Sequence, residues 1–336
     1  MPKLLIVTDA WRPQINGVVR SIENLVRELE QFDIEIDILS PAEFATAPLP
    51  GYPEIRLALT TPGRVSRRIA EFDPDFIQIA TEGPLGLMAR RAALKRNGFT
   101  SSYHTRFPEY VSARYPIPES WLYAFMRWFH NAGHGCMVAT PSLREELQAK
   151  GFTNLHIWSR GVDTDLFHPG YPAPLDLPGP VFVHVGRMAV EKNVEAFLAM
   201  DLPGSKLVVG DGPMLEDFRM RYPGVTFTGA KSGAELAALY AMGDVFVFPS
   251  LTDTFGLVVL EALASGVPVA AYPVTGPKDI IGDSGAGVVD TDLRRAAIAC
   301  LDLSSDNARA RALKFSWRAC ARQFLDATYE SYGLTR

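Results

Sequence analysis

The residues of this chain whose types and spacing most clearly suggest chemistry are two carboxylates, Asp253 and Glu261. Seven residues separate them, and Phe255-Gly256-Leu257 marks the point where an apolar strand pattern changes into a helix pattern. A helix N-terminus carries unpaired N–H groups and a partial positive charge, so it accommodates a phosphate or a sugar hydroxyl. The two carboxylates could accept hydrogen bonds from two different sugars, such as the hexose and the ribose of a nucleotide-sugar. A strand, a polar turn and an amphipathic helix also occur in α/β proteins without such a site, and Glu261 could then be solvated surface.

Two cations, Arg187 and Lys192, follow the expected strand 181–185 on either side of the turn into the next helix. Arginine supplies a planar fork of donors and lysine a compact point charge, so the two side chains could converge on one diphosphate. A pair of unrelated surface cations is the alternative interpretation.

Two further candidates follow strands in the first half of the chain. Gly17 opens the first helix after the strand 4–8, and a glycine there lets backbone N–H groups approach an anion closely. His104 ends the strand 100–104, where a satisfied structural histidine is the alternative. Ligands of open α/β sheets bind beyond the carboxyl ends of the strands, which is where both residues are expected.

Composition restricts the class of protein. The net charge of −5 argues against nucleic-acid binding, which usually requires a basic surface. Three scattered cysteines without metal-ligand spacing indicate reduced thiols in a cytoplasmic protein. The first strand begins at Leu4 without a signal peptide, and no apolar run reaches the ~20 residues of a membrane span. We therefore expect a protein that is soluble or lies on a membrane without crossing it.

Several motifs that would indicate other chemistry are incomplete. The segment Gly210-Asp211-Gly212 lacks the third glycine of the dinucleotide fingerprint, and no P-loop or hydrolase nucleophile motif occurs. Asp163-Thr164-Asp165 and Asp290-Thr291-Asp292 resemble metal-binding carboxylate pairs, but their positions favour turns and helix caps. The sequence therefore predicts no metal site and no cofactor.

Short β-branched runs alternate with helical patterns, which is typical of parallel sheets covered by helices. A chain of 336 residues is long enough for two such domains. The proline- and glycine-rich stretch 169–180 is the predicted linker between a first domain at 1–168 and a second at 181–315. The predicted strands are 4–8, 34–39, 55–59, 76–80, 100–104, 137–140 and 155–158, then 181–185, 206–209, 225–228, 245–248, 267–271 and 287–289. An amphipathic helix opened by Ser316 follows the second domain.

Taken together, these segments resemble glycosyltransferase family 4, whose members are retaining enzymes with the two-domain GT-B fold. The resemblance runs over nearly the whole chain and rests on the order and spacing of its motifs. The motifs are Thr8-Asp9, Asn16-Gly17-Val18-Val19, His104-Thr105, Arg160-Gly161-Val162-Asp163, Gly186-Arg187, Glu191-Lys192, Gly210-Asp211-Gly212-Pro213 and the block 249–266.

The resemblance implies a fold class and a role for each matching residue. The chain would be α/β, with two Rossmann-like domains facing across a cleft and residues 316–336 crossing back to the first domain. Arg187 and Lys192 would hold the donor diphosphate and stabilise the departing nucleotide without a metal. Asp253 would contact the hexose hydroxyls, and the amides of Phe255, Gly256 and Leu257 would meet the hexose or the phosphate. The other implied roles are a ribose contact for Glu261, a base contact near Lys231, approach to the diphosphate for Gly17, and contact with the transferred sugar and the acceptor for His104. No enzyme nucleophile is expected, because retention in this family is assigned to a front-face displacement.

One residue departs from the family pattern. The first carboxylate of the donor motif is usually glutamate, and here it is Asp253, which keeps the charge but has a shorter reach. The departure leaves the donor sugar open, and nothing in the sequence distinguishes uracil from guanine. The expected donor is therefore a UDP- or GDP-sugar.

The acceptor is inferred from the first domain. The expected membrane-surface residues are Arg64, Arg67, Arg68, Trp121 and Trp128. Cationic faces with aromatic side chains suit an anionic membrane, although helices with simply solvated cationic faces are the alternative. The sequence also resembles the bacterial branch of the family that includes diacylglycerol glycosyltransferases and phosphatidylinositol mannosyltransferases. We therefore expect a peripheral enzyme on the inner face of the bacterial cytoplasmic membrane that transfers a sugar to a lipid such as diacylglycerol.

Three alternatives stay open. The acceptor could be a soluble molecule or a polysaccharide, and the chain could be a catalytically silent nucleotide-sugar-binding protein. A nucleotide-sugar epimerase could share the same architecture. The acceptor's identity, the number of sugars added and the oligomeric state are open as well.

Overall fold

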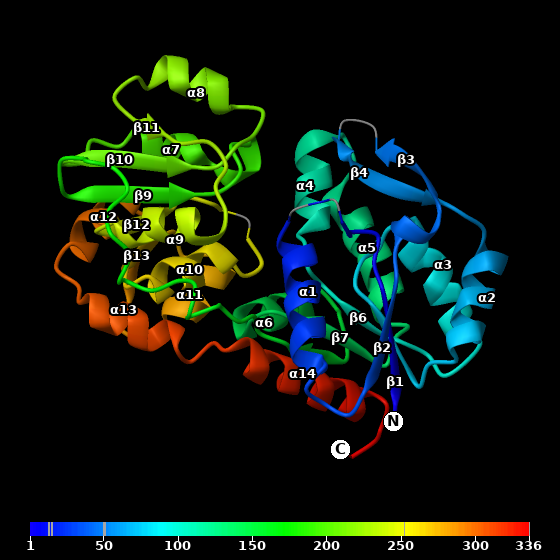
Figure 1. Cartoon of the computed structure of the whole chain (residues 1–336). Helices are drawn as coiled ribbons and strands as arrows, with labels where there is room; N and C mark the ends of the chain where they lie inside the picture. The colour runs from blue at the N-terminus through cyan, green and yellow to red at the C-terminus, as the bar shows by residue number, and fades with distance from the viewer. Residues whose placement is uncertain (13, 15, 50–51, 252, 336) are drawn as a thin grey trace. The chain divides into compact units, whose positions relative to one another are not determined.

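The structure, a computed structural model, describes all residues except 13, 15, 50–51, 252 and 336. The chain divides into two compact units (Figure 1). Unit 1 comprises residues 1–159 and 317–336, and unit 2 comprises residues 160–316. Each unit is built around a six-stranded sheet of its own.

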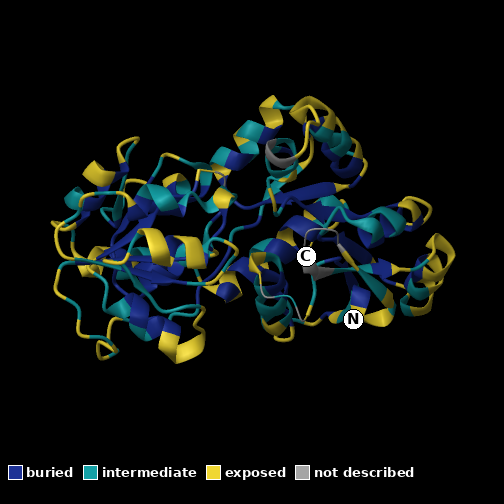
Figure 2. Ribbon diagram, turned by 90° about the horizontal axis from the view of Figure 1, so that it is seen from above, coloured by how far each residue is buried: buried dark blue, intermediate teal, exposed yellow. Residues whose placement is uncertain are grey.

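Unit 1 contains parallel strands in the order β2-β1-β5-β6-β7-β8. Leu4 to Val7 of β1 are buried, as expected for an apolar strand whose sheet is covered on both faces (Figure 2). The strands are β1 (Lys3–Val7), β2 (Glu35–Leu39), β5 (Phe76–Ile79), β6 (Thr100–Ser102), β7 (Gly135–Val138) and β8 (Leu155–Ile157). The helices before the unit's C-terminal segment are α1 (Gly17–Leu29), α2 (Pro62–Phe72), α3 (Pro84–Ala93), α4 (Phe107–Arg114), α5 (Glu119–His130) and α6 (Pro141–Ala149).

An antiparallel pair of strands forms a separate small sheet in unit 1. It consists of β3 (Ala45–Leu49) and β4 (Tyr52–Leu59), so the predicted strand 55–59 exists but does not belong to the parallel sheet. The sequence did not predict β3, which contains Pro48, because proline is uncommon inside strands. A short 3₁₀ turn, η1 (Pro41–Glu43), precedes the pair.

The C-terminal helix α14 (Trp317–Ser331) belongs to unit 1, as predicted. It packs against α1 and β7. The indole N–H of Trp158 donates to Sγ of Cys320 at 3.1 Å, and the amide of Ser159 donates to the side chain of Gln323 at 2.8 Å. These contacts, of which the Trp158–Cys320 bond is buried, make the helix part of the first unit.

Unit 2 repeats the arrangement with the strand order β11-β10-β9-β12-β13-β14. All of its strand pairs are parallel. The strands are β9 (Val181–Val185), β10 (Ser205–Val209), β11 (Thr226–Phe227), β12 (Val245–Phe248), β13 (Val269–Ala271) and β14 (Gly287–Val289). The helices are η2 (Val190–Lys192), α7 (Val194–Leu198), α8 (Leu215–Arg221), α9 (Gly233–Ala241), α10 (Leu257–Ala264), α11 (Thr275–Ile281), α12 (Leu293–Cys300) and α13 (Ser305–Ala312).

The boundary between the units differs from the predicted linker. The chain enters unit 2 at Arg160 and leaves it after Ser316, so the stretch 169–180 lies within unit 2. Arg309 on α13 holds the segment before that stretch, because its guanidinium donates to the carbonyls of Thr164 and Phe167 at 2.9 and 2.6 Å. This anchoring is long-range, whereas a proline- and glycine-rich composition reports only local chain behaviour.

Both sheets reverse their strand order at one point. In unit 1, β1 lies between β2 on one side and β5 on the other. In unit 2, β9 lies between β10 and β12 in the same way. Such switch points leave a crevice at the carboxyl ends of the strands, where α/β proteins bind ligands. In unit 2 the predicted donor motifs follow β9 and β12, the two strands that flank this point.

Candidate active site

The turn after β9 is held against the end of β12. Asn193 adopts a left-handed conformation with φ of 49°, and its side-chain amide donates to the carbonyl of Pro249 at 3.0 Å. Asparagine tolerates this conformation better than most residues. The bond fixes the 3₁₀ turn η2, which carries Lys192, beside the loop that carries Asp253.

Lys192 and Asp253 form a direct ion pair. The ammonium nitrogen of Lys192 lies 2.6 Å from Oδ2 of Asp253, and the two side chains are 28% and 18% exposed. The carbonyl of Asp253 also accepts a hydrogen bond from the hydroxyl of Thr275 at 3.0 Å, which ties the loop to the start of α11. The structure therefore brings together two of the predicted catalytic residues, at the switch point of unit 2. The other cation of the motif, Arg187, is exposed on the same turn.

The segment Phe255-Gly256-Leu257 forms the start of α10, as the sequence predicted. Gly256 has a φ of 87°, a conformation that strains any residue with a side chain, and Phe255 is buried. Gly276 lies so close to the Phe255 carbonyl that an added Cβ would be 2.0 Å from it. Because both glycines permit this tight packing, the first-turn amides of α10 are fixed beside Asp253.

Glu261 is buried rather than solvated. Its side chain lies one turn into α10, only 7% of the residue is exposed, and the hydroxyl of Tyr240 on α9 donates to Oε2 at 2.8 Å. A buried carboxylate requires hydrogen-bond donors, and here one of them is an aromatic hydroxyl with a fixed direction. The arrangement can present the carboxylate to a ligand hydroxyl in a defined orientation.

Lys231, the predicted base contact, follows β11 at the edge of the sheet. Its ammonium group lies 3.5 Å from Glu235 on α9, and the two side chains are 35% and 73% exposed. It is not part of the contacts that join Lys192 to Asp253.

His184, in the middle of β9, is a residue that the sequence analysis missed. Nδ1 lies 3.0 Å from the carbonyl of Val247, so the ring donates to β12. The pKa of His184 is lowered to about 4, because burial and the charge of Lys192 together outweigh the raising effect of that hydrogen bond. The neutral imidazole therefore links the two strands that carry the donor motifs. A histidine inside an otherwise apolar strand was the signal that could have identified it.

In unit 1, Gly17 is the first residue of α1. The side-chain oxygen of Asn16 accepts from the amides of Val18 and Val19, at 3.0 Å each, so Asn16 is the helix cap. Gly17 itself is exposed at this end of the helix, after β1, as predicted.

Asp9 makes the more extensive contacts in this region. Its carboxylate accepts from the amides of Leu85 and Gly86 at 2.8 and 3.1 Å and from the hydroxyl of Thr81 at 3.0 Å. Burial raises the pKa of Asp9 in spite of these hydrogen bonds. The residue therefore joins the end of β1 to the start of α3, a structural role that the sequence motif did not reveal.

His104 lies two residues beyond the end of β6, which stops at Ser102 and not at His104 as predicted. Its ring packs edge-on against Trp158, with 5.7 Å between the centroids. Arg106, two residues further along the chain, forms a bidentate ion pair with Glu146 on α6, at 2.9 and 2.7 Å. These contacts hold the His104 segment against the unit's core, at the carboxyl end of the sheet.

A second group of polar residues beside β5 and β6 escaped the sequence analysis. His130 at the end of α5 is 1% exposed, and its ring nitrogens lie 2.8 Å from the Ser101 hydroxyl and 3.0 Å from Glu82. Burial opposes a charge on this ring, but contacts with Cys136 and Glu82 outweigh it and raise the pKa of His130 to about 10. Glu82 is thereby fixed just after β5.

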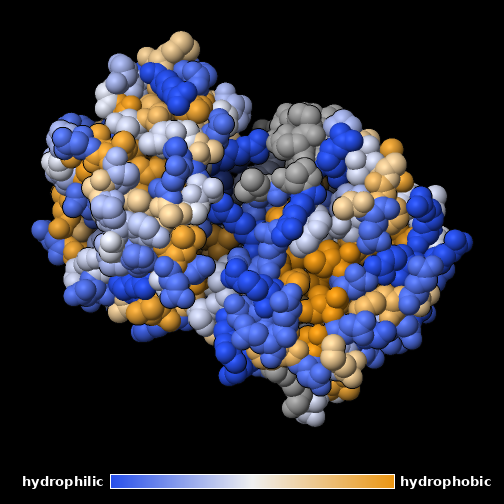
Figure 3. All heavy atoms as spheres, in the orientation of Figure 1, coloured by the Kyte–Doolittle hydropathy of each residue, from blue (hydrophilic) through white to orange (hydrophobic). Residues whose placement is uncertain are grey.

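The predicted membrane-surface residues differ from one another. Trp121 and Trp128 are exposed on α5, by 71% and 54%, and Arg64 and Arg67 are exposed on α2. Arg68 contradicts the prediction, because Asp37 and Glu43 engage its guanidinium at 2.5 and 2.9 Å, and it contributes little free positive charge. Figure 3 shows hydrophilic and hydrophobic side chains next to one another on the viewed face of unit 1.

The fold and the site together define a glycosyltransferase with the GT-B fold. Residues 15–166 match Glycosyltransferase Family 4, and residues 179–306 match Glycosyl transferases group 1. The sulfoquinovosyl transferase SQD2 of Arabidopsis thaliana is 31% identical over 94% of this chain and 71% of its own. A GDP-mannose-dependent alpha-mannosyltransferase of Mycobacterium tuberculosis is 31% identical over 85% of this chain and 83% of its own. The chain belongs to glycosyltransferase family 4, and it is a nucleotide-sugar-dependent hexosyltransferase.

Solved structures agree on the fold. Sucrose-phosphate synthase from Thermosynechococcus elongatus has a TM-score of 0.78 and 20% sequence identity, and the match covers 99% of this chain and 100% of that one. None of the helices formed by the described residues combines the length and the apolar character that crossing a bilayer requires. In the same part of the chain, no three His, Cys, Asp or Glu side chains are grouped as metal ligands.

Proposed function

We propose that the protein is a retaining glycosyltransferase that moves a hexose or hexuronate from a UDP- or GDP-sugar to a membrane lipid such as diacylglycerol. The observation that carries the donor half is the Lys192–Asp253 pair beside the N-terminus of α10, at the switch point of unit 2. A cation, a carboxylate and helix amides at one strand end suit a sugar diphosphate.

The proposed chemistry needs no enzyme nucleophile and no metal. Arg187 and Lys192 would neutralise the charge that develops on the nucleotide diphosphate as it leaves, which is electrostatic stabilisation of the transition state. Asp253 would orient Lys192 and accept from a hexose hydroxyl, and Glu261, held by Tyr240, would accept from the ribose. The acceptor hydroxyl would attack from the face that the nucleotide leaves, with a leaving-group phosphate oxygen taking its proton.

The lipid acceptor is supported by two observations of different kinds. Exposed Trp121 and Trp128 on α5, with exposed Arg64 and Arg67 on α2, give unit 1 the aromatic and cationic side chains that suit an anionic bilayer surface. A relative from Streptococcus pneumoniae, 25% identical over 90% of this chain and 78% of its own, is an alpha-monoglucosyldiacylglycerol synthase. The proposed location is therefore the inner face of the bacterial cytoplasmic membrane.

The decisive experiment is a panel of radiolabelled UDP-glucose, UDP-galactose, UDP-glucuronate and GDP-mannose with liposomes that contain diacylglycerol. Label in the organic extract would establish a glycolipid synthase and identify its donor. Release of nucleotide diphosphate with all label in the aqueous phase would replace the lipid with a soluble or polysaccharide acceptor. Donor binding without any turnover in the wild-type protein, weakened in Lys192→Ala and Glu261→Ala, would indicate a catalytically silent binder.

A further inference from the structure

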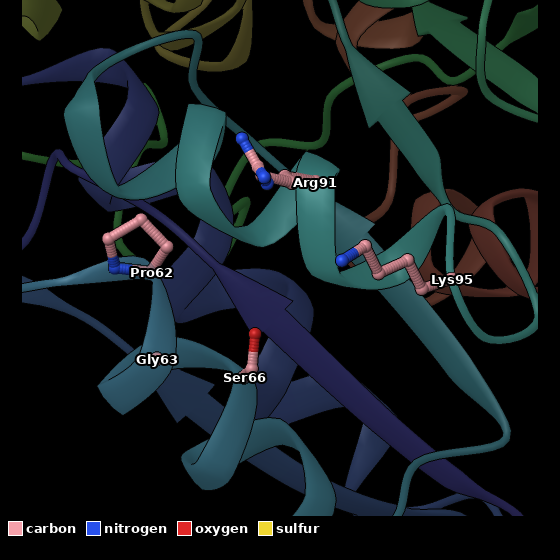
Figure 4. Close-up of a pocket in the computed structure, with 5 residues that line it drawn as sticks. All are labelled: Pro62, Gly63, Ser66, Arg91 and Lys95. Carbon is pink, nitrogen blue, oxygen red and sulfur yellow. The ribbon is translucent and has the colours of Figure 1, made fainter.

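A groove between α2 and α3 of unit 1 has no role in the proposed transfer reaction. Its volume is about 360 Å³, and it is lined by Pro62, Gly63 and Ser66 of α2 and by Arg91 and Lys95 at the end of α3 and just beyond it. Figure 4 shows the two basic side chains on one side of the groove and the start of α2 on the other. The groove therefore combines a cationic wall with a helix N-terminus.

The two cations of the groove differ from their neighbours in having no carboxylate partner among the described residues. Among the ion pairs of the described residues, none involves Arg91 or Lys95. On the same two segments, by contrast, Arg68 is paired with Asp37 and Glu43, and Arg96 is paired with Asp73. Arg91 and Lys95 are also four residues apart, a spacing at which like charges repel one another. An anion between them would relieve that repulsion.

The start of α2 contributes donors to the same groove. The side chain of Thr61 caps the helix by accepting a hydrogen bond from the amide of Arg64 at 3.4 Å. The amide of Gly63, also in the first turn, is one of the N–H groups that have no acceptor within the helix. A Cβ added to Gly63 would meet nothing within 4 Å, so the groove is not crowded beside this residue. The hydroxyl of Ser66 lines the groove one turn further on. The four groups are those that recognise phosphate: a guanidinium, an ammonium, a hydroxyl and a helix amide.

Two apolar side chains near these helices in the sequence are exposed. Leu94 directly precedes Lys95 and is 46% exposed, and Leu59 at the end of β4 is 57% exposed. α3 packs against both α2 and β4. Exposed leucines on segments that adjoin the groove helices in the sequence favour a phosphate at a lipid surface over one in free solution.

We propose that the α2–α3 groove is a binding site for a phosphate-type anion, separate from the sugar-transfer site, and that the headgroup of an anionic membrane lipid supplies it. The anion-binding site stands on the groove alone, whereas the lipid source rests on the proposed membrane function. When a headgroup phosphate occupies the groove, Arg91 and Lys95 anchor unit 1 to the bilayer independently of the acceptor.

The test compares the full-length protein with Arg91→Gln/Lys95→Gln and with a matched control, Arg96→Gln. Binding is measured by co-sedimentation with phosphatidylcholine vesicles that contain or lack phosphatidylglycerol, and by thermal shift with inorganic phosphate. Ser66→Asp is a second variant, which removes neither basic side chain and places a carboxylate in the groove. The double variant should weaken binding to the anionic vesicles roughly thirtyfold, because each of the two lost basic residues contributes about 1 kcal/mol near such a surface. Ser66→Asp adds one negative charge to the groove and should weaken binding roughly fivefold. Arg96→Gln should change it less than about twofold, since Asp73 already neutralises that arginine.

Three outcomes separate the sources. Weakened vesicle binding in the groove variants alone supports the headgroup. A stabilisation by inorganic phosphate that the groove variants lose, without any vesicle effect, supports the anion site with free phosphate as its ligand. Groove variants that match Arg96→Gln in both assays overturn the proposal. Failure of the proposed transfer reaction would look different. The wild-type protein would form no glycolipid from any donor, but the groove variants would still bind anionic vesicles more weakly than the wild type.

Discussion

The ammonium nitrogen of Lys192 lies 2.6 Å from Oδ2 of Asp253, although 61 positions of the chain separate the two residues. The pair forms because β9 and β12 are neighbours in the sheet and because Asn193 ties the turn after β9 to Pro249. One member is basic and the other acidic, so each fixes the other in the absence of a ligand. The site of unit 2 is in this sense preorganised for a substrate that carries both hydroxyls and a diphosphate.

Removing either member of this pair should abolish most transfer activity. Lys192→Gln and Asp253→Asn should each lower kcat/KM by about 100-fold or more, the usual effect of losing one group that stabilises transition-state charge. The double variant should lose less than the product of the two single effects, because each residue orients the other. Steady-state kinetics with the donor that the radiolabelled panel identifies would measure this, with Lys314→Gln, an exposed lysine of the same unit, as the control.

The same variants should leave the fold nearly unchanged. The pair is partly solvated, so its contribution to the free energy of unfolding should be at most about 1 kcal/mol. Full multiplicative effects in the double variant, or a large loss of stability, would contradict the assigned role.

Glu261 should act on donor binding more than on turnover. Glu261→Gln keeps the shape of the side chain but weakens hydrogen bonds to the ribose, and donor KM should rise about tenfold or more. Tyr240→Phe keeps the ring and removes only the hydroxyl that holds Oε2, so it should raise KM by a smaller factor. Isothermal titration with the nucleoside diphosphate gives the same comparison without catalysis. Equal effects of both variants on kcat, with KM unchanged, would contradict a ribose contact.

Much of the fold was predictable from local sequence. Strands such as 181–185 and 245–248 are apolar runs bounded by turn residues, and the structure has them with the predicted bounds. The pairing of strands and the unit boundary depend on contacts between distant residues. The bonds from Arg309 that draw residues 164–167 into unit 2 have no local signature, so the composition of 169–180 was misleading.

The candidate site was predictable in its residue types and not in its contacts. Lys192 and Asp253 were both singled out, but their pairing depends on the left-handed conformation of Asn193. The roles of His184 and His130 depend on complete burial, and a sequence shows a histidine without its surroundings. Arg68 illustrates the converse, since a basic pattern on α2 looked cationic but is locally neutralised by two carboxylates from outside the helix.

His184 should make unit 2 sensitive to acid. Its pKa is lowered to about 4 in the folded protein, by burial first and by nearby Lys192 as well, whereas the unfolded value is about 6.5. Between about pH 6.5 and about pH 4 the unfolded chain is therefore protonated at His184, whereas the folded chain is not. The free energy of unfolding should fall by at most about 3 kcal/mol as the pH drops through this range. His184→Gln retains a donor for the carbonyl of Val247 and cannot titrate in this range.

Hydrogen exchange of the amides of β9 and β12 would measure this effect within unit 2. Protection should decline between about pH 6.5 and about pH 4 in the wild type, after correction for intrinsic exchange, and the decline should be shallower in His184→Gln. His168→Gln removes a histidine from a loop of the same unit and should retain the wild-type slope. Identical slopes in all three proteins would show that His184 does not govern acid stability.

His130 should give unit 1 the opposite dependence. Its pKa is raised to about 10, because contacts with Cys136 and Glu82 outweigh the effect of burial. A raised pKa means that the stabilisation is complete below about pH 6.5 and is lost as the pH rises from there through about 10. All five tryptophans lie in unit 1, so urea unfolding followed by tryptophan fluorescence reports on this unit.

His130→Gln should lower the stability of unit 1 at neutral pH and flatten its decline in alkali, since Glu82 then lacks a buried cationic partner. His156→Gln is the matched control, because His156 pairs at 3.5 Å with the largely exposed Glu330, and such a surface pair contributes about 0–1 kcal/mol. Cys136→Ala removes the thiol and tests whether the ring alone accounts for the pH dependence. The stability of unit 1 should still decline in part as the pH rises in this variant, because Glu82 still raises the pKa of His130. A decline that disappears in Cys136→Ala but persists in His130→Gln would assign the alkaline dependence to the thiol and would remove His130 as its source.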